Sequence, residues 1–287
     1  MSKLALGTVQ FGLDYGIKND RGRIPESEIG QILDEAMSGG IDLLDTACAY
    51  GSSETVLGIL AGKTSGFSII SKLPAKSEAS VAEELAGSLA RLGRKTLYGY
   101  MLHNFSTYQA HPSVMRDLAA CKAQGLVEKI GASLYFPSEA ETLLEDDVPL
   151  DLVQVPYNLL DRRFEKVFPL LKARGVEIHT RSAFLQGLFF LDQSRLGGRF
   201  ETVRMSIARL QALATESGFG LPTLCLGFAA ACPHVDRVVI GVDTINDLRA
   251  NLASWSQREH AKKVLVILGD ISSEDENIIL PYKWEKR

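Results

Sequence analysis

The sequence predicts a single (β/α)8 (TIM) barrel domain over residues 1–287, with an extra helix between strands 7 and 8 and a C-terminal extension. Three observations lead to this fold class. Eight short apolar runs alternate with helical patterns, which implies parallel strands joined by helical crossovers. No low-complexity linker or exact repeat divides the chain. A length of 287 residues is long for an ordinary domain but normal for an α/β barrel.

The expected strands are short and rich in β-branched or aliphatic residues. They span residues 4–8, 41–45, 67–72, 97–103, 129–133, 152–155, 176–181 and 235–241. Eight such units in one unbroken chain favour a closed barrel over an open sheet.

The expected helices have recognisable starts and stops. Pro25 and the acids after it open a helix that Gly39 closes. Ser80 and Glu83 have capping-box spacing. A helix is expected over 163–173, ahead of Gly175.

The longest gap between expected strands separates the seventh from the eighth. It contains helical patterns over 202–215 and 221–231, which predicts the inserted helix. After the eighth strand we expect the last barrel helix over 244–255 and an extension that ends near Trp284.

Composition excludes several classes of protein. The net charge of −4 and the lack of a long Lys/Arg run argue against a nucleic-acid partner. No run of about 18 apolar residues could span a membrane, and the first apolar run is too short for a signal peptide, so a cytoplasmic location is expected. The cysteines at 48, 121, 225 and 232 lack metal-binding spacing, so free thiols and no metal are expected.

Ionisable residues end three of the early strands. Asp45, Lys72 and His103 close the second, third and fourth runs, and Tyr50 follows Asp45 in a glycine-containing loop. Active sites of such barrels lie at the carboxyl ends of the strands. We therefore expect a carboxylate, an ammonium, an imidazole and a phenol at one mouth.

This set of groups suits the reduction of a carbonyl by hydride. The negative charge that develops on oxygen must be neutralised by a proton, and a free phenol with a pKa near 10 is a poor donor. A neighbouring Lys72 ammonium would lower the pKa of Tyr50, and Asp45 would hold Lys72 in place. His103 would orient the substrate oxygen.

The same residues resemble the aldo-keto reductase family. Asp45-Thr-Ala-Cys-Ala-Tyr50-Gly-Ser-Ser-Glu54 is similar to the family signature D-T-A-x-x-Y-G-x-S-E, and the match runs in order from Leu4 to Asn251. The resemblance implies that Tyr50 is the general acid, that Lys72 and Asp45 tune it, and that His103 positions the carbonyl.

The resemblance also implies a nicotinamide cofactor. No Gly-x-Gly-x-x-Gly follows a strand, so a Rossmann module that would bind it is absent. The cofactor would lie across the barrel mouth, with Ser133 and Gln154 on its carboxamide and the loop 182–187 over its pyrophosphate. The residues implied as cofactor contacts are Thr8, Asp45, Ser133, Gln154, Arg181, Ser182, Gly241, Asp247 and Asn251.

Three departures from the family pattern concern charge. Arg181 stands where the family often has an aromatic ring, which suggests either packing against the cofactor or binding of an acidic or phosphorylated substrate. Gly241 and Asp247 stand where basic residues commonly hold the 2′-phosphate of NADP, so the choice between NADP and NAD stays open with a lean towards NAD. Arg249 is the nearby cation that would reverse this lean.

The expected partner is a small-molecule carbonyl compound, with no obligatory protein partner. Phe11, Tyr15 and Asn104 lie in loops at the expected mouth and are candidate substrate contacts.

Two alternatives stay open. Lys72 would form a Schiff base in an aldolase-type enzyme, although Asp45 would keep its amine charged. The chain would otherwise be a non-catalytic barrel that binds nicotinamide nucleotide. A metal-dependent hydrolase is disfavoured because the five histidines are widely spaced and form no HxH pair.

Overall fold

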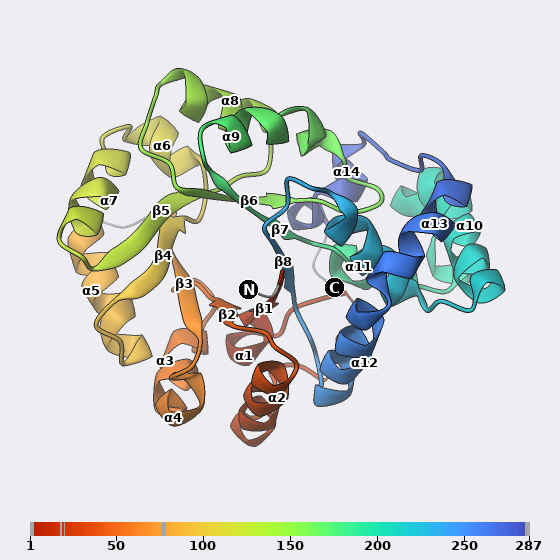
Figure 1. Ribbon diagram of the computed structural model, residues 1–287, viewed down its shortest axis with the longest axis horizontal. Coiled ribbons are helices and arrows are strands. Elements are labelled where there is room, and N and C mark those ends of the chain that lie inside the picture. Colours follow the sequence, from red (N-terminus) through yellow and green to blue (C-terminus); the bar gives the residue numbers. More distant parts are fainter. Residues whose placement is uncertain (1–2, 18, 20, 76–78, 285–287) are drawn as a thin grey trace.

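The structure is a computed structural model that describes residues 3–17, 19, 21–75 and 79–284. Eight parallel strands form a closed barrel in chain order, and β8 pairs with β1 (Figure 1). The strands are β1 Leu4–Gly7, β2 Leu43–Asp45, β3 Ser68–Leu73, β4 Leu97–Leu102, β5 Val127–Ser133, β6 Leu152–Pro156, β7 Glu177–Arg181 and β8 Arg237–Ile240. The predicted (β/α)8 barrel is confirmed, with strand ends shifted by one or two residues.

Helices surround the barrel and fill the connections between strands (Figure 1). The α-helices are α1 Val9–Gly12, α2 Glu26–Ser38, α3 Ser53–Ile59, α4 Ala61–Thr64, α5 Val81–Leu92, α6 Ser106–Ala110, α7 Val114–Ala123, α8 Pro137–Glu145, α9 Phe168–Ala173, α10 Glu201–Ser217, α11 Leu221–Ala231, α12 Ile245–Ser256, α13 Arg258–Leu268 and α14 Glu276–Ile279. The 3-10 helices are η1 Arg163–Lys166, η2 Leu185–Phe190, η3 Gln193–Arg195, η4 Gly198–Phe200 and η5 Pro281–Lys283.

Local sequence signals place several of these helices. Ser80 caps α5: its hydroxyl accepts from the Glu83 amide at 3.3 Å, and the Glu83 carboxylate accepts from the Ser80 amide at 2.8 Å. Gly93, at φ +63°, ends the same helix in the left-handed conformation. The predicted capping box of α5 is therefore confirmed.

The prediction of one helix over 163–173 is wrong. The segment divides into η1 and α9. Pro169, near the start of α9, has no amide hydrogen to donate to the carbonyl of Glu165, so one continuous α-helix cannot form across it.

The insertion between β7 and β8 contains both predicted helices. α11 packs against β8 and α12 as part of the barrel's outer layer, whereas α10 lies further out beside α13 at the edge of the molecule (Figure 1). A second hydrophobic cluster joins the loop after β7, α10, α11 and the C-terminal segment through Ile279 and Trp284. The extra helix and the C-terminal extension are thus confirmed.

The barrel interior is packed at its centre and charged toward the amino ends of its strands. A small apolar cluster fills the centre; it consists of Ala5, Leu43, Ile70, Met101, Leu152 and Val239. Near the amino ends, Glu177 accepts hydrogen bonds from the Tyr98 hydroxyl at 2.8 Å and from Lys129. The opposite end, where strands finish, is left for the site.

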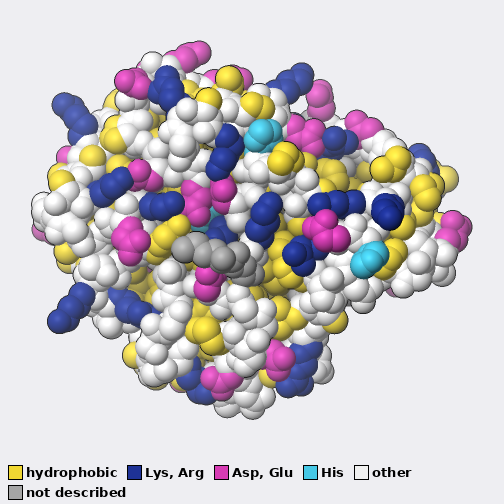
Figure 2. Space-filling model, in the orientation of Figure 1, with side chains coloured by type: hydrophobic (Ala, Val, Ile, Leu, Met, Phe, Trp, Pro, Cys, Tyr) yellow, Lys and Arg dark blue, Asp and Glu magenta, His cyan; other side chains and the backbone are white. Residues whose placement is uncertain are grey.

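The outer surface carries mixed charge on the face seen in Figure 2, where basic and acidic side chains are interspersed. Within the described residues, no helix is both long and apolar enough to cross a bilayer.

Candidate active site

Four predicted residues meet at the carboxyl ends of the strands. The Lys72 ammonium, on β3, donates to Asp45 Oδ1 at the end of β2 over 2.7 Å and to the carbonyl of Thr46 over 3.0 Å. The same nitrogen lies 3.4 Å from the Tyr50 hydroxyl oxygen. His103 directly follows β4, and its ring meets the Tyr50 ring edge-on with centroids 5.6 Å apart.

The pKa of Tyr50 is raised, contrary to the prediction that Lys72 makes it unusually acidic. Burial is the largest cause and the negative charge of Asp45 adds to it, while Arg181 acts in the opposite direction. Asp45 is 3% exposed, so water screens its charge little and the charge acts on the buried phenol. Tyr50 is therefore a protonated phenol at neutral pH.

The two bases beside Tyr50 also respond to burial. Burial lowers the pKa of Lys72, and the Asp45 carboxylate opposes this by stabilising the ammonium. Burial and the Lys72 charge lower the pKa of His103 to about 4. His103 is therefore neutral at physiological pH and carries one N–H, which can donate a hydrogen bond to a substrate oxygen.

Two glycines shape the turn that carries Tyr50. Gly51 has φ +57°, a conformation that residues with a Cβ rarely adopt. Gly12, at the end of α1, lies so close to this turn that a Cβ there would be 1.8 Å from the Tyr50 carbonyl oxygen. The position of Tyr50 thus depends on the absence of a side chain at residue 12.

Thr8 belongs to the scaffold under this turn. Its hydroxyl is fully buried, donates to the Asp45 carbonyl at 3.0 Å and accepts from Ser53 at 2.9 Å. These bonds tie the end of β1 to the end of β2 and to α3. The structure therefore places Thr8 beside Asp45 with its hydroxyl occupied by the protein.

Glu54 is a further residue of the signature whose role sequence reasoning missed. It is 1% exposed, accepts from Arg91 Nε at 2.7 Å and accepts from the Ser71 hydroxyl. Because Ser71 precedes Lys72 on β3, Glu54 links α3, β3 and α5 behind the site. Its place in the D-T-A-x-x-Y-G-x-S-E pattern was the available signal.

Ser133, at the end of β5, and Gln154, in the middle of β6, lie side by side as register partners. The Gln154 amide nitrogen donates to Asp45 Oδ2 at 2.7 Å. Among the described residues, neither the Ser133 hydroxyl nor the Gln154 carbonyl oxygen has a hydrogen-bond partner. One donor and one acceptor at adjacent positions match the carbonyl and amino groups of a carboxamide. This donor set fits a nicotinamide.

The N-terminus of α12 is surrounded by carboxylates. Asp247 bonds to Thr244 within the first turn, and the Glu28 carboxylate of α2 accepts from the Ile245 amide at 3.2 Å. Arg249, further along α12, pairs with Glu35 at 2.9 Å, and Glu28 is itself paired with Arg21 at 3.0 Å. Glu28 is a neighbour that the sequence did not indicate, because it comes from a distant helix.

Two other residues predicted at the adenosine end lie near this turn. Gly241 follows β8, and a Cβ there would be 2.8 Å from the amide nitrogen of Gln10, so the Gln10 side chain covers it. The Gln10 carbonyl oxygen is buried without a hydrogen-bond partner in the described structure. Asn251 is 6% exposed on α12.

The mouth is bordered by Arg181 and aromatic side chains. The Arg181 guanidinium lies over the Tyr135 ring, 4.2 Å from its centroid, and donates to the Leu134 carbonyl at 3.1 Å. Ser182 follows with φ +64°. The Tyr15 hydroxyl accepts from Gln186 at 2.8 Å, which joins the loops after β1 and β7.

The two other predicted substrate contacts have protein partners. Phe11, on α1, is 1% exposed and belongs to the main hydrophobic core. The Asn104 side-chain oxygen accepts from the Ser106 amide at 2.9 Å and so begins α6. Sequence reasoning missed Tyr135. Its ring lies against the Arg181 guanidinium, so it is a stronger candidate for a side chain at the mouth than Phe11.

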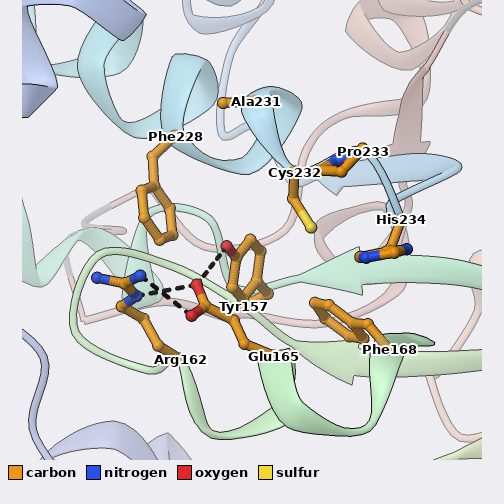
Figure 3. A pocket seen from close by; sticks show the side chains of 9 residues that line it. All are labelled: Tyr157, Arg162, Glu165, Phe168, Phe228, Ala231, Cys232, Pro233 and His234. Carbon is orange, nitrogen blue, oxygen red and sulfur yellow. Dashed lines mark hydrogen bonds and ion pairs between the residues drawn. The ribbon is translucent and has the colours of Figure 1, made fainter. Parts of the chain in front are cut away.

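A cavity of about 330 Å³ lies elsewhere, on the flank of the barrel between η1, α9 and α11 (Figure 3). Its walls include the stacked rings of Tyr157 and Phe228, with centroids 4.9 Å apart. Glu165, also in the wall, is bonded to Tyr157 at 2.7 Å and to Arg162 at 2.9 Å. None of the four clustered residues lines this cavity, and three of its polar side chains (Tyr157, Arg162 and Glu165) are bonded to one another, so we do not assign the chemistry to it.

A closed barrel whose carboxyl-end mouth holds a phenol, an ammonium, a carboxylate and an imidazole defines a barrel enzyme equipped for acid–base chemistry. The family model described as "Aldo/keto reductase family" matches residues 3–266. The chain therefore belongs to the aldo/keto reductase family and is an oxidoreductase.

Individual relatives agree with this assignment. The chain is 29% identical to the NADH-specific methylglyoxal reductase of Escherichia coli (strain K12), across 88% of this chain and 90% of the relative. It is 23% identical to the uncharacterized oxidoreductase YqkF of Bacillus subtilis (strain 168), across 96% and 94%. The aldo-keto reductase AKR11C1 from Bacillus halodurans, in its holo form, has the same fold with a TM-score of 0.73 at 23% identity, covering 92% of both chains.

Proposed function

We propose that the protein reduces an aldehyde or ketone to the alcohol with a nicotinamide cofactor, and that Tyr50 donates the proton. One observation carries this proposal: the Tyr50 hydroxyl lies 3.4 Å from a Lys72 ammonium that is anchored by Asp45 at 2.7 Å. The phenol thus has a fixed cationic neighbour at the rim of the barrel. The cofactor supplies hydride when bound.

The electrostatics define what each side chain does. Burial keeps the Tyr50 phenol protonated until a substrate oxygen gains negative charge. As the proton leaves Tyr50, the phenolate accepts a hydrogen bond from Lys72, which limits the cost of its charge in a buried place. Neutral His103 donates a hydrogen bond to the same substrate oxygen and orients it. Ser133 and Gln154 hold the carboxamide of the cofactor.

The chain's own charges favour NADH over NADPH. A 2′-phosphate at the first turn of α12 would meet the Asp247 carboxylate, and the nearby cations Arg21 and Arg249 are already paired, with Glu28 at 3.0 Å and with Glu35 at 2.9 Å. Carboxylates repel phosphate and accept hydrogen bonds from a ribose hydroxyl instead. The relative named NADH-specific methylglyoxal reductase supports the same preference.

The structure gives no support to the Schiff-base alternative. Lys72 is 0% exposed and its nitrogen already contacts Asp45, Thr46 and Tyr50. A nucleophilic amine needs a neutral form and an open approach for the carbonyl. The Asp45 carboxylate stabilises the charged form of Lys72, and the burial of Lys72 closes the approach to its nitrogen.

Replacing Tyr50 by Phe tests the proton donor. We expect kcat to fall by about 10²- to 10⁴-fold, because a positioned general acid contributes that much, while the dissociation constant for NADH is unchanged. The measurement is NADH absorbance with a panel of aldehydes, ketones and sugars, and Tyr108→Phe, the same change at a site bonded to Asp146, is the control. Equal activity in Tyr50→Phe and the parent would contradict the role.

Cofactor choice is tested by fluorescence titration of the protein with NADH and NADPH. We expect tighter binding of NADH, and we expect Glu28→Gln with Asp247→Asn to strengthen NADPH binding by about tenfold, because the Asp247 charge is lost and Arg21 is released from its ion pair with Glu28. The matched control is Glu26→Gln, which removes an exposed charge from the first turn of α2. Tighter NADPH binding by the parent protein would refute the preference.

A further inference from the structure

Arg181 is held in a fixed orientation at the mouth. It is the last residue of β7 and is half-buried. Its guanidinium plane lies over the Tyr135 ring at 4.2 Å, and one nitrogen donates to the Leu134 carbonyl at 3.1 Å. Tyr135 is itself held edge-on by Tyr282 of the C-terminal segment, with centroids 4.7 Å apart. These contacts fix the direction in which the other N–H groups point.

The charge of Arg181 has no counter-ion in the described structure, where no carboxylate lies within 4 Å of it. Nearby cations are neutralised: Lys72 by Asp45 at 2.7 Å and Arg163 by Asp161 at 2.9 Å. Neutral His103 adds no charge. The charges of Arg181 and Arg163 partly offset the rise that burial causes in the pKa of Glu139, but the Glu139 carboxylate accepts from the Tyr135 and Phe136 amides and forms no ion pair with Arg181. Among the described residues, the Arg181 guanidinium is therefore a cation without a direct ion pair.

This charge reaches the reacting groups. It lowers the pKa of Tyr50, where it opposes the larger effect of burial. It also lowers the pKa of His103 and of Lys72, where it adds to the larger effect of burial. Arg181 is the last residue of β7, Asp45 is the last residue of β2 and Lys72 lies near the end of β3, so these side chains share the carboxyl rim of one closed parallel barrel. A ligand bound by the guanidinium is therefore bound within the same site as the proposed acid.

The free donors of Arg181 suit a carboxylate. A guanidinium carries five N–H groups in a planar fork, and one pair of them matches both oxygens of a carboxylate. Only the bond to Leu134 uses this capacity among the described residues. Stacking on Tyr135 leaves the edge of the fork open while it shields one face from water.

We infer that the carbonyl substrate carries a carboxylate, which Arg181 binds while the carbonyl oxygen faces Tyr50 and His103. The substrate class is an oxo acid, either a 2-oxo acid or an aldehyde acid with a short spacer. This inference rests on the proposed function. A pyrophosphate of the cofactor would satisfy the same cation, so the experiment must separate the two anions.

The turnover experiment compares glyoxylate, succinic semialdehyde and glutaric semialdehyde, each beside its methyl ester. We expect Arg181→Leu to lower kcat/KM for the best acid by about 10- to 100-fold more than for its methyl ester, as the loss of a charged hydrogen bond does. Any effect of the lost charge on Tyr50 and His103 is shared by acid and ester, and the loss for the acid should exceed any change in the NADH dissociation constant. Arg181→Lys keeps the charge but loses the fork, so an intermediate loss is expected. Arg195→Leu, at an exposed position, is the matched control.

Equal losses for acids and esters, or a parallel weakening of NADH binding, would overturn the inference and assign Arg181 to the cofactor or the scaffold. A binding experiment separates its failure from that of the proposed function. Calorimetry with 4-hydroxybutyrate and its amide, in the presence of NADH, should show binding of the acid alone to the parent and to Tyr50→Phe, and none to Arg181→Leu. If no carbonyl is reduced at all, the proposed function fails and the inference fails with it. If the esters are reduced but the acids are not preferred and the acid does not bind, the inference alone fails.

Discussion

At the Tyr50 hydroxyl, burial and charge oppose each other. The sequence predicted the neighbours of this phenol correctly, because residues that end parallel strands must share one rim of a barrel. It predicted the wrong direction for the pKa of Tyr50. The cost of burying an anion depends on every atom that covers the ring and on how strongly the Asp45 charge acts on it, and neither can be read from a motif.

The burial of His103 can be tested by the pH dependence of the free energy of unfolding. In an unfolded chain His103 titrates near 6.5, whereas in the fold its pKa is about 4. Between these values the unfolded chain holds a proton that the fold does not, so the free energy of unfolding falls as the pH falls from 6.5 to about 4. The expected loss is roughly 3 kcal/mol over that interval.

The measurement is urea unfolding at several pH values for the parent and for His103→Gln. The variant should lose less stability than the parent between pH 6.5 and 4, and the two should run parallel above 6.5. His111→Gln, at an exposed site, is the control. Identical pH dependence in the parent and His103→Gln would show that His103 is not buried in its neutral form.

At the scale of elements, the capping signals and the apolar strand runs were sufficient to predict the barrel. Contacts between elements that are distant in the sequence could not be predicted from these signals. The break between η1 and α9 was visible in Pro169 and was missed because the apolar stripe continued through it. The approach of Glu28 on α2 to the start of α12 had no local signal. It arises because the first and last strands of the barrel are neighbours.

Glu54 tests how elements are joined behind the site. Glu54→Leu should lower the free energy of unfolding by about 1–3 kcal/mol, because the buried Ser71 hydroxyl loses its acceptor, and should reduce kcat through displacement of Lys72. Glu54→Gln keeps an acceptor for Ser71 and should cost less. The measurements are urea unfolding and NADH turnover. A Leu variant as stable as the Gln variant would contradict this role.

At the scale of the whole molecule, the barrel and the C-terminal extension meet in the second hydrophobic cluster. The loop after β7 contributes Leu185 and Leu188, and the C-terminal segment contributes Ile279 and Trp284. The composition and hydropathy of the sequence predicted that an extension exists. They could not predict that it packs against the loop proposed to cover the pyrophosphate.

Ile279, which is 0% exposed, provides the test of this packing. Ile279→Ala should lower the free energy of unfolding by about 2–5 kcal/mol and should speed amide hydrogen exchange over 185–191. Ile267→Ala is the same change at a side chain that is 72% exposed and should have little effect. Unchanged exchange over 185–191 in Ile279→Ala would show that the extension does not support the loop.

The contact of Gly12 with the Tyr50 turn bears on how this enzyme tolerates variation. A single added methyl group at residue 12 would push against main chain rather than against a flexible side chain. Libraries that aim to broaden the range of compounds accepted should therefore vary Tyr15 and Tyr135 and keep Gly12 constant. We expect a natural variant with a side chain at residue 12 to lose activity because Tyr50 is displaced, although all four ionisable side chains of the site are still present.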